Sequence, residues 1–169
     1  MKKCIFSILF VALMSINLSA QVITRKTSIE NINEVSRFVD KVKIDVKTMP
    51  KIDIDKLLLE DEEDKKANVP FRFGSAFNVN YNLENSGTWI DIGTGRVWAL
   101  EIKCQNAYSI NLAFDNFYLP SKSKLYIYNK DKKVLQGPYT SEINTQNATY
   151  ATDLIEGSTV VLAYFEPYV

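Results

Sequence analysis

The chain has 169 residues, with 20 basic and 20 acidic side chains, 46% hydrophobic residues, two cysteines and no histidine. This length suits one ordinary domain, and the balanced charge argues against a nucleic-acid binder, which normally carries a basic surplus. Without histidine the chain has no Ser-His-Asp triad, no Cys-His pair and no His-ligated zinc or haem site. The composition therefore excludes the commonest catalytic arrangements and names no activity.

The first twenty residues have the three parts of a secretory signal peptide. Two lysines give a positive start, an apolar stretch covers residues 4–14, and more polar residues lead to Ala20. The apolar stretch is shorter than the roughly 20 residues that a membrane-spanning helix needs. We expect cleavage between Ala20 and Gln21, export to the periplasm or the extracellular space, and no membrane association after cleavage.

Residues 21–69 are expected to form an N-terminal arm or linker, because they contain no glycine and a single aromatic residue, Phe38. The residue spacing at 27–30 is that of a capping box and predicts the start of a helix. Apolar and charged residues alternate over 42–47, which predicts an extended strand. The extended, glycine-free segment 42–69 would lie against a partner or pack as an edge strand.

A short helix is expected after Pro50. Asp53 or Asp55 would cap it, leucines at 57–59 would follow, and it would end in the acid–base run 60–66. Calcium loops place acidic residues alternately around a glycine turn, and this run has no glycine. We therefore interpret the run as a solvated linker and predict no metal site.

Residues 70–169 are expected to form the packed domain, since they contain all six glycines and most of the aromatics. Gly93-Thr94-Gly95 has the chemistry of a tight hairpin turn. Gly137-Pro138 permits at best a bent or edge strand. The other expected strands are 71–81, 88–92, 96–103, 108–114, 125–128 and 159–165. Six to eight short strands separated by turns predict an all-β, antiparallel, jelly-roll-like sandwich over 70–169.

No catalytic residue and no cofactor are predicted for this chain, because no pair of acidic residues is singled out by its position and no nucleotide-binding or nucleophile motif is present. Three aromatics are candidates for surface binding: Trp89 beside the hairpin, and Tyr126 and Tyr128 on one face of a strand. Such rings stack on sugars, which suggests a carbohydrate- or cell-surface-binding module with glycan partners. The competing interpretation is that they pack in the core, where aromatics are common.

A series of short motifs follows in order along most of the chain after the leader. They are Met49-Pro50-Lys51-Ile52-Asp53, Leu58-Leu59-Glu60-Asp61, Val69-Pro70-Phe71-Arg72-Phe73-Gly74, Asn85-Ser86-Gly87-Thr88-Trp89, Gly95-Arg96-Val97-Trp98-Ala99-Leu100, Ala107-Tyr108-Ser109-Ile110-Asn111-Leu112, Phe117-Tyr118-Leu119-Pro120, Leu125-Tyr126-Ile127-Tyr128-Asn129 and Tyr164-Phe165-Glu166-Pro167. Together they resemble the N-terminal, non-catalytic region of secreted bacterial trypsin-like serine endopeptidases of the lysyl endopeptidase type.

The resemblance implies a pro-region or accessory domain that docks on a trypsin-like protease domain, aids its folding and keeps it latent. The protease domain would lie in the same chain or in a separate one. The triad of that family lies further along the chain, and none of its residues matches a position here. The sequence ends at Val169, about where the protease would begin. This fits a fragment, a stand-alone relative or a truncated product with no independent role.

Overall fold

The computed structural model describes residues 35–168. The expected leader, its cleavage site at Ala20 and Gln21, and the capping box at 27–30 lie outside the described residues. The described residues form a β-rich fold with one longer helix, α2, at Ile54–Lys66. Among them, no helix is long and apolar enough to cross a membrane.

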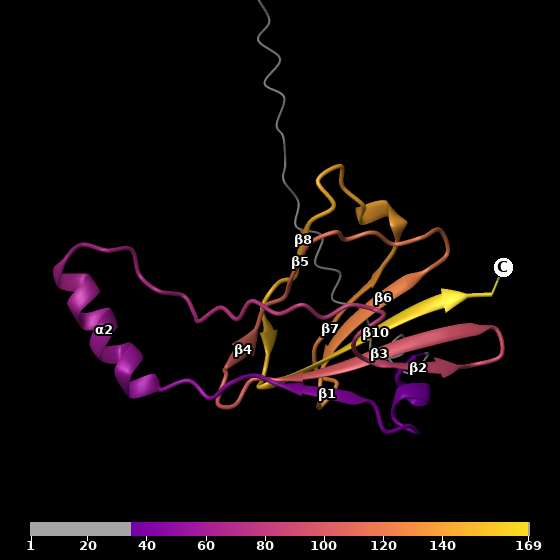
Figure 1. The fold of residues 1–169 in the computed structure, drawn as a ribbon, viewed down its shortest axis with the longest axis horizontal. Helices are drawn as coiled ribbons and strands as arrows, with labels where there is room; N and C mark the ends of the chain where they lie inside the picture. The colour runs from indigo at the N-terminus through magenta and orange to yellow at the C-terminus, as the bar shows by residue number, and fades with distance from the viewer. Residues whose placement is uncertain (1–34, 169) are drawn as a thin grey trace, which may run out of the picture.

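A six-stranded mixed sheet forms the body of the molecule (Figure 1). Its order is β1-β3-β10-β6-β7. β1 and β2 pair with the same edge of β3, each along one half of that strand. β1 runs parallel to β3, whereas every other pair in the sheet is antiparallel. The strands are β1 Asp45–Thr48, β2 Thr88–Asp91, β3 Gly95–Lys103, β6 Lys124–Asn129, β7 Leu135–Tyr139 and β10 Thr159–Pro167.

Both faces of this sheet are buried. Successive side chains of a strand point to opposite faces, so the apolar residues of each central strand contribute to both. On β3, Trp98 and Leu100 belong to one apolar cluster, and Val97 and Ala99 belong to a second cluster on the opposite face. Residues 35–39 form a short helical turn whose Val35 and Val39 contribute to the second cluster. The first cluster also contains Ile110, Phe117, Leu119 and Ile155, which come from the segments between the long strands.

The segments over the first cluster form two small antiparallel ladders. β4 (Ser109–Ile110) pairs with β9 (Ile155–Glu156), and β5 (Ala113–Phe114) pairs with β8 (Tyr150–Ala151). A 3-10 helix, η1, lies between β7 and β8 at Ser141–Ile143. The expected long strand at 108–114 is thus present as two short pieces.

Several sequence predictions are confirmed. The hairpin turns across Gly93-Thr94-Gly95, and β7 is an edge strand that is irregular at the cis Gly137–Pro138 bond. The alternating stretch at 42–47 gives β1, which lies at one edge of the sheet. Asp53 is the N-cap of α2, and its carboxylate accepts a hydrogen bond from the Lys56 backbone N–H.

The strand predicted at 71–81 is wrong. These residues belong to no strand, and they are extended but unpaired. The alternation of apolar residues predicts a strand, but Phe71 and Phe73 are exposed and only Phe77 packs against the first cluster. Period-two patterning is necessary for a half-buried strand, but it does not supply the neighbouring strand that pairing requires.

Candidate functional site

The exposure expected for Tyr126 and Tyr128 is wrong. Each is only 2% exposed, and both belong to the second apolar cluster. β6 lies between β10 and β7, and the turn at 35–39 adds to the same cluster, so these rings are core components. Burial, with Asp40 and Glu101 nearby, raises the pKa of Tyr128 well above its ordinary value. Neither ring offers a face for stacking on a sugar.

Trp89 is half-buried, and its ring is already in contact with the protein. It lies opposite Trp98 in the β2–β3 register, and its indole N–H donates to the Leu83 carbonyl at 3.2 Å. The Arg96 guanidinium lies 4.1 Å from the ring centroid, and Tyr164 meets the ring edge to face at 6.2 Å. Arg96 therefore occupies one face of the ring, where a sugar could otherwise stack.

The acidic groups with shifted pKa values are held by structural partners. Glu101 is buried on β3; burial raises its pKa, but hydrogen bonds from Lys130 and Lys103 outweigh burial and lower it. The Tyr168 hydroxyl and the Gly93 backbone N–H lower the pKa of Asp91. Among residues 35–168, no three His, Cys, Asp or Glu side chains gather as a metal site would require. Burial raises the pKa of the Cys104 thiol, which disfavours a nucleophilic thiolate.

The most unusual surface feature is a projecting arm, which we define as residues 51–82. It consists of α2 and a return segment, residues 67–82, and Figure 1 shows α2 standing apart from the sheet at the end of two extended connections. No residue of α2 is buried, and Leu58 and Leu59 are 58% and 68% exposed. A helix with apolar side chains and no packing partner in its own domain is a candidate interaction element.

Arg72 connects the return segment to α2. Its guanidinium Nη2 donates to Glu60 at 2.9 Å, its Nε lies 3.0 Å from an Asp61 carboxylate oxygen, and Asp64 lies 3.9 Å away. The hydrogen bond with Glu60, together with Asp61 and Asp64, raises the pKa of Arg72. The arm is therefore an assembled unit in which the acidic run of the helix holds the returning chain.

The return segment carries the most exposed apolar side chains of the arm. Phe71 is 73% exposed and Phe73 is 98% exposed, and their rings meet edge to face at 5.6 Å. Residues 70–79 make no backbone hydrogen bond with any other described residue. A Cβ added at Gly74 would meet nothing within 4 Å, so a side chain at this position would have open space.

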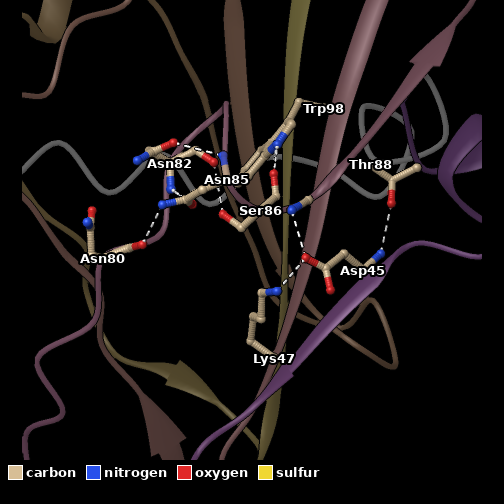
Figure 2. Close-up of polar contacts among 9 residues, drawn as sticks. Asp45, Lys47, Asn80, Asn82, Asn85, Ser86, Thr88 and Trp98 are labelled. Carbon is tan, nitrogen blue, oxygen red and sulfur yellow. Dashed lines mark hydrogen bonds and ion pairs between the residues drawn. The ribbon is translucent and has the colours of Figure 1, made fainter.

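Figure 2 shows how the base of the arm is fixed to the sheet. The Asp45 carboxylate on β1 accepts from the Gly87 backbone N–H at 2.9 Å and pairs with Lys47. The Asp45 backbone N–H donates to the Thr88 hydroxyl at 2.9 Å. These bonds join β1, which precedes the arm, to β2, which follows it, so both connections start from fixed positions.

A turn at residues 82–86 completes the base (Figure 2). The Asn82 side chain accepts from the backbone N–H groups of Glu84 and Asn85, and the Trp98 indole N–H donates to the Ser86 carbonyl at 2.6 Å. Asparagine side chains stabilise turns in this way. The return segment is therefore held by Arg72 at one end and by this turn at the other.

Sequence reasoning missed Phe71 and Phe73 as surface residues because it placed them on a strand of the packed domain. One signal was available: Gly74-Ser75-Ala76 interrupts the apolar series, and a basic residue, Arg72, follows an acidic run at 60–64. Neither a protein-family model nor a solved structure matches the chain.

Proposed function

We propose that this chain is a secreted, non-catalytic pro-region or accessory domain of a trypsin-like serine protease of the lysyl endopeptidase type. It would dock on the protease domain through the arm, assist its folding and keep it latent until the link between them is cut. The observation that supports this most directly is the arm itself, which exposes Phe71, Phe73, Leu58 and Leu59 to no partner within the described chain.

The sequence resemblance and the arm coincide, which supports the assignment. Three of the motifs that carry the resemblance, at 49–53, 58–61 and 69–74, lie on the arm or at its root. Met49 is buried in the first apolar cluster. The other residues of these motifs contribute little to the core, so stability of the sheet alone does not explain their identity. We also propose that the fold is a jelly-roll-like sandwich, with the β4–β9 and β5–β8 ladders as its second layer.

The test is a refolding experiment. The purified chain is added to a denatured trypsin-like lysyl endopeptidase domain during dilution, and the yield of folded protease and its hydrolytic activity are measured. We expect a higher yield and a lower activity while the chain is present. If neither quantity changes, the proposed function is wrong.

A matched pair of variants locates the docking surface. Phe73→Ala removes an exposed ring on the arm, whereas Tyr118→Ala removes a 71% exposed ring on the body. We expect Phe73→Ala to weaken inhibition by roughly tenfold or more, as loss of a central aromatic anchor does, and Tyr118→Ala to leave it unchanged. Equal effects of the two variants would argue against docking through the arm.

A further inference from the structure

We infer that residues 71–79 act as a donated β-strand, which pairs through its backbone with an exposed edge strand of a β-sheet in the partner. This inference rests on the proposed function and specifies how the docking occurs. Its central observation is that these residues are extended yet lack backbone hydrogen bonds to the rest of the described chain.

The sequence of the segment suits pairing. Phe71, Phe73, Phe77 and Val79 recur at even spacing, and aromatic and β-branched residues are favoured in strands. Water satisfies the backbone groups of an exposed segment, so the free chain tolerates the lack of a neighbour. An edge strand of another sheet would replace that water with a hydrogen-bond ladder, as in other cases of β-strand addition.

The segment is also held ready for this pairing. Arg72 ties one end to α2, Phe77 packs against the first apolar cluster, and the Asn82 turn fixes the chain beyond. Between these points, Ser75 and Ala76 are exposed and make no hydrogen bond with any described residue. Fixing a strand at both ends lowers the entropy lost when it pairs.

Two edges of the sheet in this chain, those of β7 and β1, are obstructed, which disfavours a second copy as the partner. On β7, Pro138 has no N–H and the ladder to β6 is irregular. Beside β1, Gly87 and Thr88 bond to Asp45, and the Lys47 ammonium lies 5.8 Å from the Tyr81 ring centroid. We therefore assign the partner edge to the trypsin-like protease domain of the proposed function.

Two neighbouring proline variants test the inference. Successive residues of a strand direct their N–H groups to opposite edges, so only one of Ser75 and Ala76 donates to the partner. Ser75→Pro and Ala76→Pro each remove one N–H from an extended, unpaired position. The probe is a lysyl endopeptidase-type catalytic domain whose nucleophilic serine is replaced by alanine, and binding is measured by calorimetry with the full chain.

We expect one proline variant to weaken binding by at least about tenfold and the other by less than about threefold. In the wild-type complex, amides of residues 71–79 should also gain protection from hydrogen exchange at alternate positions. Two harmless prolines, or two equally harmful ones, would overturn strand donation while leaving docking intact. Absence of any complex with the wild-type chain would overturn the proposed function as well. Protection of 71–79 by self-association alone would identify a second copy as the occupant and contradict the assignment.

Discussion

At the scale of single residues, Gly87 joins the base of the arm to the core. It has a φ of +76°, and a Cβ at this position would lie 2.2 Å from the Trp98 ring. Gly93 has a similar φ of +81°, but a Cβ there would meet nothing within 4 Å. At both glycines a larger residue would have a strained, positive φ, but only at Gly87 would its side chain also clash with a neighbour. Comparing the two positions therefore distinguishes backbone strain from steric clash.

We predict that Gly87→Ala lowers the free energy of unfolding by about 3 kcal/mol or more, whereas Gly93→Ala costs about 1 kcal/mol. Urea unfolding followed by tryptophan fluorescence measures both. The physical reason is that Trp98 is buried and donates its indole N–H to the Ser86 carbonyl, so the ring has little freedom to move away. Equal losses of unfolding free energy in the two variants would mean that the clash with Trp98 does not affect stability.

Glu101 gives a prediction about pH. Its pKa is lowered by Lys130 and Lys103 despite burial, so its ion pairs stabilise the fold above the unfolded-state value of about 4.3. This stabilisation disappears as the pH falls through the lower folded-state pKa. Glu101→Gln should therefore cost about 1–3 kcal/mol near neutral pH, and the difference from wild type should shrink towards about pH 3. Denaturant midpoints at several pH values measure it, and a constant difference would contradict it.

At the scale of elements, Arg72 is expected to control α2 locally. Arg72→Gln removes the contacts with Glu60, Asp61 and Asp64, which are partly exposed ion pairs of the kind that contributes little to global stability. We predict that amides of α2 exchange roughly two- to tenfold faster. The free energy of global unfolding should change by less than about 0.5 kcal/mol, because α2 buries no residue.

Arg72→Lys is the matched control for this prediction, because it keeps the charge but loses the planar fork that reaches several carboxylates. It should fall between wild type and Arg72→Gln in amide exchange. A large drop in global stability for either variant would show that α2 is part of the cooperative unit and is not an appended element.

How far the sequence predicted these elements depends on where each element finds its stabilising contacts. The β2–β3 hairpin, β6, β10 and the Asp53 cap were predictable, because their signals are local turns, caps and alternation. The parallel pairing of β1 with β3 was not, since it joins residues far apart in the chain. Residues 71–81 and β1 have the same kind of pattern, and only the tertiary fold decides that β1 pairs and 71–81 does not.

The candidate site was less predictable than the fold, for the same reason. Tyr126 and Tyr128 have the alternation of a strand with one open face, but the turn at 35–39 helps to bury that face. Exposure depends on what lies over a strand, and no short-range pattern encodes it. Trp89 was the intermediate case, because its ring is half-exposed but already in contact with Arg96.

At the scale of the whole molecule, the arm should be the first place where a protease cuts. Phe73 is 98% exposed in a segment without backbone hydrogen bonds to the described chain. Proteases cleave such exposed, unpaired segments more readily than paired strands. We predict that brief chymotrypsin treatment cuts after Phe71 or Phe73 and leaves the body intact. Mass spectrometry of the fragments identifies the cut.

The two pieces should remain together after this cut, because β1 from the first piece pairs with β3 from the second. They should therefore co-elute on a sizing column under native conditions and separate in urea. The double variant Phe71→Ala with Phe73→Ala should lose the early cut. Initial cleavage inside β3 or β10 would contradict the description of the arm as the most accessible part of the fold.

The position of β10 has a consequence for how the molecule is made. Thr159–Pro167 lies between β3 and β6, so the last strand along the chain occupies the middle of the sheet. Before β10 is in place, the two halves β1–β2–β3 and β6–β7 have no strand pairing between them. Folding of the sheet should therefore wait for β10, be dominated by long-range contacts, and be slow compared with helical proteins of the same size.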